Sequence, residues 1–263
     1  RRDKNPYAIW VSEVMLQQTQ AQRVAPRYER FVASWPDPVS CAAAPLGELL
    51  AVWQGLGYPR RCRNLHEAAK TVVDRHGGEL PSTLDELVAL PGVGDYTARA
   101  VLAFAFCRDV GPVDTNVSRV LSRWAGEPLG RTQAQARADA AVPPGRSWEW
   151  NQSMMDLGAT ICTSRSPKCG ACPVREQCAW RGGPDGDPAP RSAGASRPQS
   201  RFAGSDRQAR GHLMRALVES PVREDAVAAA MGLAHDAPRA TALLDSLRAD
   251  GLVSIVDGWC RLP

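Results

Sequence analysis

Leu90-Pro91-Gly92-Val93-Gly94 is the stretch that decides the fold of this chain. It separates two segments with helical character, and we expect helices over 83–89 and 95–106 on either side of it. The glycines allow a tight turn and a close approach of the backbone to a ligand. The N–H groups that open the second helix form an anion site, which suits a DNA phosphate. The stretch therefore predicts a helix–hairpin–helix, and an ordinary connection between two helices is the alternative.

The rest of residues 1–180 is also helical in character. Asn5-Pro6 supplies an N-cap and a proline at the first helical position, so we expect a helix over 7–18. No alternation of apolar and polar residues is long enough for a convincing strand. The predicted fold class is therefore mainly α. The remaining helices are predicted over 20–34, 45–54, 61–76, 115–125, 132–141 and 147–161.

Four of the eight cysteines follow one another with the spacing C-x6-C-x2-C-x5-C. Zinc sites usually pair two short C-x2–4-C elements across a longer loop, and this segment has only one such element. Four thiolates on one compact loop can hold the corners of an iron–sulfur cube. We expect a 4Fe-4S cluster, with zinc, or free or disulfide-bonded cysteines, as the alternatives. The predicted ligands are Cys162, Cys169, Cys172 and Cys178.

The C-terminal third has a different composition. Residues 181–207 are rich in Gly, Pro, Ser and Arg, and Phe202 is their only large apolar residue, so we expect a flexible linker. Residues 208–263 read as three helices followed by a β-hairpin that turns at Asp257-Gly258. This order is that of a winged helix, and any small helical module with a hairpin tail is the alternative. The predicted domains are 1–180 and 208–263.

The overall composition excludes several classes of protein. The chain has 263 residues, of which 44% are hydrophobic and 23% charged, so it can bury a core and is not wholly disordered. Its apolar runs fall short of the roughly 18 residues that a membrane span needs. The net charge of +4 is mildly basic. A tight cysteine group without a secretion signal indicates a reducing compartment, and we expect a cytoplasmic protein.

Val113-Asp114-Thr115-Asn116 opens the helix predicted over 115–125. An aspartate in this position is normally an N-cap. The functional alternative places its carboxylate at the mouth of a cleft below the hairpin. Both interpretations stay open on local grounds.

Taken together, the hairpin, Asp114 and the cysteine loop resemble the helix-hairpin-helix DNA glycosylase superfamily. Within it, the chain is similar to the MutY-type A/G-specific adenine DNA glycosylases. The resemblance covers residues 1–180 without large gaps. The matching stretches are 10–20, 55–58, 90–97, 114–121 and 151–159, the last of which runs into Cys162.

The resemblance implies roles for two carboxyl groups. An N-glycosidic bond breaks through an oxocarbenium-like sugar, which needs a proton for the leaving base and a negative charge beside the sugar. Glu13 takes the place of the residue that protonates adenine, and Asp114 that of the residue that stabilises the sugar cation. Asn116 would support Asp114 or a nearby water. Tyr96 stands where bifunctional endonuclease III relatives carry a lysine, so the resemblance implies a monofunctional enzyme that leaves the backbone intact.

The resemblance also implies contacts with a duplex from which adenine is flipped out. Tyr58 is expected to wedge into the base stack, and Gln152 to touch the flipped adenine. Packing at a helix end is the alternative for Tyr58 and Gln18. The full set of expected DNA-binding residues is Gln17, Gln18, Thr19, Tyr58, Gly92, Gly94 and Gln152.

Two features depart from the family pattern. Thr115 stands where many adenine glycosylases have glycine, and endonuclease III relatives share this threonine. Residues 208–263 are too short and too helical for the nudix-like β domain of longer members, so we expect a short form without it. The expected partner is double-stranded DNA containing adenine opposite 8-oxoguanine or guanine, and we expect a monomer. The alternatives are a thymine mismatch glycosylase or endonuclease III-like enzyme, and a non-catalytic iron–sulfur DNA-binding regulator.

Overall fold

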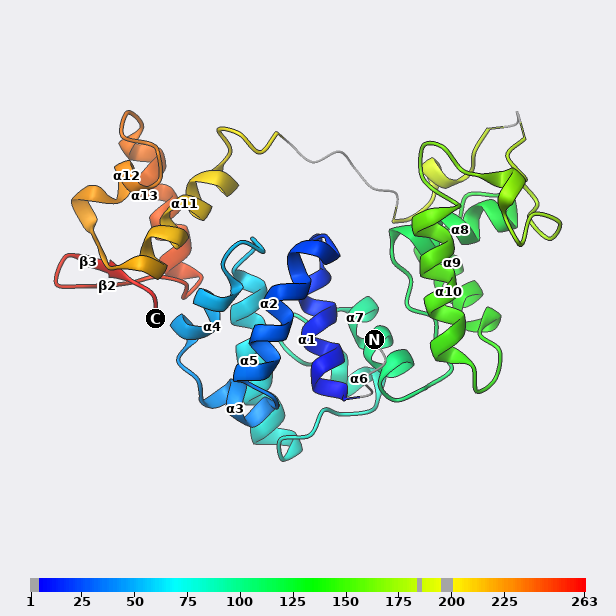
Figure 1. The fold of residues 1–263 in the computed structure, drawn as a ribbon, viewed down its shortest axis with the longest axis horizontal. Coiled ribbons are helices and arrows are strands. Elements are labelled where there is room, and N and C mark those ends of the chain that lie inside the picture. The colour runs from blue at the N-terminus through cyan, green and yellow to red at the C-terminus, as the bar shows by residue number, and fades with distance from the viewer. Residues whose placement is uncertain (1–4, 184–185, 195–200) are drawn as a thin grey trace. The chain divides into compact units, whose positions relative to one another are not determined.

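A computed structural model describes residues 5–183, 186–194 and 201–263. These residues form two compact units (Figure 1). The first unit combines 5–9, 82–88, 93–183 and 186–194, and the second combines 10–81, 89–92 and 201–263. This division differs from the predicted one, because the helices of 1–180 are shared between both units and the C-terminal segment belongs with the second. The domain boundaries 1–180 and 208–263 stay predictions.

The first unit is a group of helices around one apolar core. Its α-helices are α6 (Leu84–Val88), α7 (Asp95–Phe104), α8 (Thr115–Ala125), α9 (Arg131–Ala141) and α10 (Ser147–Thr160). Apolar residues recur at helical spacing on α8, so that Val117, Val120 and Leu121 belong to the same buried core as Phe104 and Met154. Gly158 brings α10 against α8 because a Cβ there would lie 2.8 Å from the Asn116 Cβ. The core thereby fixes the start of α8.

The second unit begins with the larger part of α1 (Pro6–Leu16). It continues with α2 (Ala21–Ser34), α3 (Pro38–Ala43), α4 (Leu46–Trp53) and α5 (Arg60–His76). Trp10, Phe31, Trp53 and Leu65 are almost fully buried there. Asn5 caps α1, since its Oδ1 accepts from the N–H groups of Tyr7 (3.0 Å) and Ala8 (3.3 Å).

The predicted helices of residues 1–180 are all present, with ends that differ by a few residues. The sequence interpretation missed α3. Its signals were available, since Asp37 accepts from the Ser40 N–H at 2.7 Å, the Ser40 hydroxyl reaches back to the Asp37 N–H, and Pro38 occupies the first turn. A six-residue helix has too few turns for a periodic pattern to reveal it.

The C-terminal module, which we define as residues 206–263, has the element order of a winged helix. It comprises α11 (Asp206–Glu219), β1 (Val222–Arg223), α12 (Val227–Ala230), α13 (Ala237–Ala249), β2 (Ser254–Val256) and β3 (Trp259–Arg261). The strands are antiparallel in the order β1-β3-β2, with Cys260 opposite both Val222 and Ile255. Asp257 and Gly258 both have positive φ, as the predicted tight hairpin turn requires. Three helices and a hairpin are confirmed, and β1 is an addition.

The segment predicted as a flexible linker is partly ordered. Within 181–207, a 3-10 turn at Ala189–Arg191 packs on the first unit, with Ala189 buried. The Ala193 N–H donates to the Leu129 carbonyl at 2.8 Å, and Ser192 Oγ accepts from the Leu129 N–H. The prediction of a linker that is flexible throughout is wrong for residues 187–194, because backbone hydrogen bonds compensate for its poor apolar content.

In the described part of the chain, the helices are all too short or too polar to cross a lipid bilayer.

Candidate active site and cluster loop

Asp114 occupies the N-cap of α8, so the N-cap interpretation of this residue holds. Its Oδ1 accepts from the Val117 N–H at 2.7 Å, and its Oδ2 accepts from the Asn116 side-chain amide at 3.0 Å. The positive end of the helix dipole also favours a negative charge here. The structure thus brings Asp114 and Asn116 together and holds the carboxylate in one orientation.

Arg119 connects this carboxylate to the cysteine loop. Its Nη2 donates to Asn116 Oδ1 and to the Gly158 carbonyl, both at 2.7 Å, while its Nε donates to the Cys162 carbonyl at 2.8 Å. Burial lowers the pKa of Arg119 from its usual value. A continuous set of hydrogen bonds therefore runs from Asp114 through Asn116 and Arg119 to the backbone of Cys162.

Tyr96 and Gln152 are the two other predicted residues of the first unit. Tyr96 lies in the first turn of α7 and packs, half-buried, against the core that also contacts α8. Gln152 lies on α10, where its amide donates to Asp156 Oδ1 at 2.9 Å. The side-chain amide of Gln152 is thus engaged one turn along its own helix.

Glu13 lies on α1 in the second unit and is only 2% exposed. Val14 and Met15, its neighbours in the chain, are buried as well. Gln18 then adopts a left-handed conformation (φ 56°) just after the end of α1. The Thr19 hydroxyl donates to the Leu56 carbonyl at 3.2 Å, which joins the segment after α1 to the turn before α5.

Arg61 is the centre of this arrangement, and the sequence interpretation missed it. Its guanidinium donates to the carbonyls of Val14, Met15 and Gln17 at 2.6–2.9 Å, and to those of Leu56 and Gly57 at 3.1–3.2 Å. It thereby satisfies the carbonyls at the end of α1, which have no partner within that helix. Burial lowers the pKa of Arg61 to about 10, so the side chain stays protonated at neutral pH.

Tyr58 lies between these groups and the exterior. It has a left-handed backbone (φ 50°), is 37% exposed, and its ring centroid lies 5.6 Å from the Arg61 guanidinium carbon. Trp53 contacts the same guanidinium at 5.4 Å. The structure therefore brings Tyr58 and the segment Gln17–Thr19 together around one arginine.

The two hairpin glycines differ in their surroundings. Gly92 has φ 74°, and a Cβ there would lie 2.6 Å from the Asn64 Cβ on α5, so no other residue fits. Gly94 is the N-cap of α7, and a Cβ at this position meets no atom within 4 Å. The space at Gly94 is open to a ligand that approaches the N–H groups of α7.

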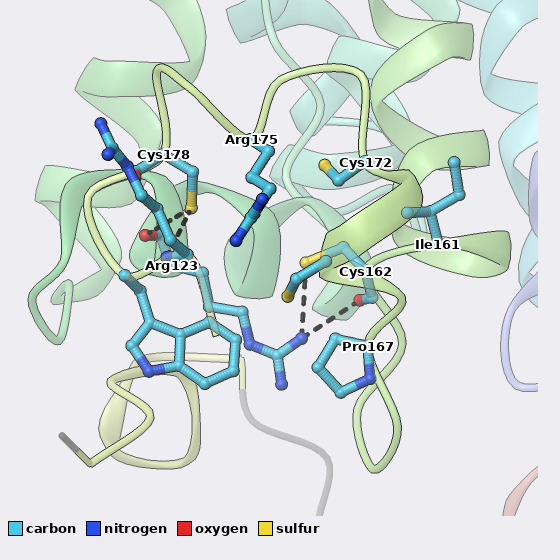
Figure 2. A pocket seen from close by; sticks show the side chains of 10 residues that line it. Arg123, Ile161, Cys162, Pro167, Cys172, Arg175 and Cys178 are labelled. Carbon is cyan, nitrogen blue, oxygen red and sulfur yellow. Dashed lines mark hydrogen bonds between the residues drawn. The ribbon is translucent and has the colours of Figure 1, made fainter. Parts of the chain in front are cut away.

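The four cysteines predicted as ligands line one cavity in the first unit (Figure 2). Arginines also line it, and Arg123 donates to Cys162 Sγ at 3.4 Å, while the Arg181 N–H donates to Cys178 Sγ at 3.5 Å. Burial and then the neighbouring thiols raise the pKa of Cys169. Among the described residues, no three metal-binding side chains gather closely enough for a single ion. A cavity lined by four thiols suits a 4Fe-4S cluster, in which each iron takes one cysteine.

Arg123 on α8 holds the cluster loop, which we define as residues 162–178, in place. Its side chain is 2% exposed and pairs with both carboxylate oxygens of Asp187, with a closest distance of 2.6 Å. It also donates to the Thr163 carbonyl at 2.7 Å and lies 4.7 Å from the Trp180 ring. Burial alone would lower the pKa of Arg123, but the bonds to Asp187 and Cys162 raise it overall. This one residue joins α8, the cysteine loop and the segment 187–194.

Comparisons with known proteins agree with this geometry. Residues 11–143 match the family model of the HhH-GPD superfamily of base excision DNA repair proteins. An adenine DNA glycosylase from Mycobacterium tuberculosis is 43% identical over 98% of this chain and 86% of its own length. The chain belongs to the adenine DNA glycosylase family. The human adenine DNA glycosylase is 44% identical over 68% of this chain, which corresponds to 34% of the human protein.

Solved structures of the superfamily have the same fold. A thermostable thymine-DNA glycosylase aligns with a TM-score of 0.66 at 30% identity, over 69% of this chain and 86% of its own. An endonuclease III–DNA complex aligns with a TM-score of 0.59 at 28% identity, over 68% and 85%. The predicted helix-hairpin-helix glycosylase fold is therefore confirmed.

The iron–sulfur prediction is confirmed at the level of the motif. Residues 162–178 match the iron–sulfur binding domain of endonuclease III, which spans the first to the last of the four cysteines. These cysteines line one cavity, and two of them, Cys162 and Cys178, accept N–H donors, as thiolates that hold a 4Fe-4S cluster do. In this family member, the cluster loop packs directly on the helix that Asp114 caps.

Several residues that organise the site were missed because their types are common and their partners are distant in sequence. Arg119 and Arg123 recur at i, i+4 on α8, which places them on one face of the helix. The arginines in the first turn of α5 stand at the positive end of its dipole, an unfavourable position that signals an external partner. Asp187 gave no signal, because it lies in a segment whose composition is that of a linker.

Proposed function

We propose that this chain excises adenine mispaired with 8-oxoguanine or guanine in duplex DNA, by hydrolysing the N-glycosidic bond. The adenine DNA glycosylase relatives support the base, and the resemblance of the motifs supports the mispair. The chain would act on DNA as a monomer in the cytoplasm. The finer assignments depend on the residues discussed below.

The observation that carries the proposal is the contrast between two carboxyl groups. Glu13 is almost fully removed from water on α1, and the resemblance gives it the role of the general acid. Asp114 accepts two hydrogen bonds at the N-terminus of α8, which hold its carboxylate in one orientation. Two carboxyl groups in opposite environments provide the acid and the charge stabiliser that glycoside cleavage needs.

In the proposed mechanism, Glu13 donates its proton to the departing adenine. The C–N bond breaks, and Asp114 stabilises the positive charge that develops on the sugar. Water then adds to the sugar and gives its surplus proton to the Glu13 carboxylate, which leaves an abasic site and an intact backbone. Asn116 holds the Asp114 carboxylate in place throughout. Cys162, Cys169, Cys172 and Cys178 would hold a 4Fe-4S cluster, which would order the loop behind α8.

Tyr96 supports a monofunctional reaction. Strand cleavage through a Schiff base requires a lysine amine, and tyrosine offers a phenol in its place. The lysines of this chain are Lys4, Lys70 and Lys168, none of which lies in the hairpin segment. The enzyme therefore releases the base without cutting the strand.

The proposed DNA contacts come from both units. In the second unit, Tyr58 is exposed and rests on Arg61, so it can enter the base stack while the segment Gln17–Thr19 contacts the opposite base. Gly92 shapes the hairpin, and Gly94 leaves room for a phosphate at α7. Gln152 would contact the flipped adenine after leaving its bond with Asp156.

Thymine excision from a G:T mispair is the second candidate. The aligned thymine-DNA glycosylase supports it, with 30% identity against 43% for the adenine relative. Position 115 is a threonine, as in endonuclease III relatives, which also leaves this activity open to test.

Gel assays on three duplexes separate these functions. Each duplex carries A opposite 8-oxoguanine, T opposite G, or an oxidised pyrimidine, and each is analysed with and without alkali. We expect cleavage of the first duplex alone, and only after alkali. Strand cleavage without alkali, a borohydride-trapped adduct, or preference for either other duplex would contradict the proposal.

A further inference from the structure

Three arginines lie at the N-terminus of α5, where positive charge is unfavourable. Arg60, Arg61 and Arg63 occupy its first turn, which has no acidic residue and no side-chain cap. Positive charge is unfavourable there, because the N-terminus of a helix carries a partial positive charge. Carboxylates or carbonyls from other segments must therefore compensate for these three charges.

Asp250 of the C-terminal module places a negative charge at the C-terminus of a helix. It is the C-cap of α13, where the helix dipole is negative and an acidic residue is unfavourable. Within the second unit, Asp250 contacts the first turn of α5. Arg60 Nε lies 2.5 Å from Asp250 Oδ2, and Arg63 Nη1 donates to the Asp250 carbonyl at 2.6 Å. Each helix end supplies the charge that the other lacks.

The module reaches the same region at two further points. The Pro263 carbonyl accepts from the Gly47 N–H at 2.8 Å, which satisfies a free donor in the first turn of α4. A Cβ on Gly47 would lie 2.6 Å from that oxygen, so this contact requires glycine. Arg207, in the first turn of α11, donates to the Tyr58 hydroxyl at 3.2 Å.

Arg61 transmits this docking to the proposed DNA contacts. It shares the first turn of α5 with Arg60 and Arg63, but its guanidinium faces the end of α1 and the turn at 56–58. Fixing this turn of α5 therefore fixes Arg61, and with it both the segment Gln17–Thr19 and Tyr58.

We propose that the C-terminal module is an internal brace that positions the Tyr58 turn and the segment Gln17–Thr19, with Asp250 as a positioning residue. This inference rests on the proposed function only for the role of Tyr58 on DNA. The charges of α13 agree with it, since both of its basic residues are paired: Arg239 with Asp206 at 2.7 Å and Arg248 with Asp245 at 3.5 Å. A helix whose positive charges are already paired is a poor reader of phosphates.

Hydrogen exchange of the full-length protein without DNA tests the brace. In Asp250→Asn the loss of charge should speed exchange of the amides of 55–61 and 17–19 by about threefold, the scale of one partly exposed ion pair. Asp250→Arg should have a larger effect. The double variant Arg60→Asp/Asp250→Arg should restore slow exchange, because it re-forms the pair with reversed charges.

Two further variants supply a matched control and a second, independent perturbation of the contact. Asp245→Asn makes the same chemical change on the same helix, away from α5, and should leave exchange at 55–61 unchanged. Gly47→Ala favours the helical state of α4 by itself, yet displaces the Pro263 carbonyl, so it should speed exchange at 55–61. Unchanged exchange at 55–61 in Asp250→Arg, or no restoration in the double variant, would overturn the brace.

A second experiment measures DNA binding and the rate of adenine excision. In Asp250→Arg we expect weaker binding of a duplex with A opposite 8-oxoguanine, with an unchanged excision rate once enzyme saturates the DNA. An equal loss of the saturated rate would overturn a positioning role. If the wild-type chain fails to excise adenine, the proposed function fails, while the exchange measurements still decide whether the brace exists.

Discussion

At the scale of single residues, the proposed site depends on charged side chains that are each held by several partners at once. Asp114 caps α8, Arg119 and Arg123 lie on it, and each of the three is held by hydrogen bonds of its side chain. Such residues lose more than one hydrogen bond when they are replaced, and the groups that they leave behind stay buried. Their replacement therefore gives sharper effects than replacement of exposed residues.

Asp187→Asn tests the ordered segment behind the cluster loop. Burial alone would raise the pKa of Asp187, but the pairing with Arg123 lowers it overall. The ionised form therefore stabilises the folded state fully above the ordinary value of 3.8, and this contribution is lost as pH falls through the lower folded-state pKa. We expect the variant to lose about 2 kcal/mol of unfolding free energy at pH 7.

The measurement is denaturant unfolding of the cluster-loaded protein at a series of pH values. The difference between wild type and Asp187→Asn should shrink as the pH falls below 3.8. Asp74→Asn, at an exposed position on α5, is the matched control and should show no difference at any pH. A difference for Asp187→Asn that stays constant with pH would mean that its charge is not the cause.

At the scale of elements, the structure joins helix ends through arginines in addition to apolar packing. Arg61 joins the end of α1 to the turn before α5, and Arg123 joins α8 to the cysteine loop. Both side chains satisfy backbone carbonyls that have no partner within their own elements. The turns that carry the proposed DNA contacts thus depend on a few buried charges.

Arg61→Gln should loosen the turns that carry Gln18 and Tyr58. A glutamine cannot reach the five carbonyls that Arg61 contacts, and each buried carbonyl left without a donor costs about 1–3 kcal/mol before relaxation. We expect a net loss of about 3 kcal/mol in unfolding free energy, measured by urea denaturation. Arg30→Gln, at an exposed position on α2, should change it by less than about 0.5 kcal/mol. Equal effects of the two substitutions would show that Arg61 is not an organising residue.

Cys172→Ala tests the cluster loop. Iron analysis of the purified wild-type protein should give about four irons per chain, and the variant should retain far less. We expect faster proteolysis within 162–178 before any change in the distant helices. Cys107→Ala is the control, because Cys107 is exposed and lies outside the cavity. One zinc and no sulfide in the wild-type protein would contradict the cluster.

At the scale of the whole molecule, the proposed catalytic residues are divided between two units. Glu13, Tyr58 and the segment Gln17–Thr19 belong to the second unit, whereas Asp114, Tyr96 and the four cysteines belong to the first. Each unit has its own core and its own network of charged residues. The effect of a variant on the stability of its own unit can therefore be measured separately from the other unit.

The sequence predicted those parts of the molecule whose signals are local. The hairpin glycines, the Asp114 cap and the cysteine spacing each act over a few residues, and all were recognised. Asp187 and Asp250 were not, because their partners, Arg123 and Arg60, lie 64 and 190 residues away. A long-range ion pair leaves no periodic trace, so a segment with the composition of a linker can still pack on its neighbours.

The most direct test of the central claim is single-turnover excision of adenine from a duplex with A opposite 8-oxoguanine. Wild-type protein in excess over DNA should convert the duplex to an alkali-labile abasic product. Glu13→Gln and Asp114→Asn preserve the shape of their side chains, and each should reduce the rate by at least about 10²-fold, the usual contribution of a general acid or a charge stabiliser, while binding to the mispair persists. A rate close to wild type in either variant would contradict the assignment of the two carboxyl groups.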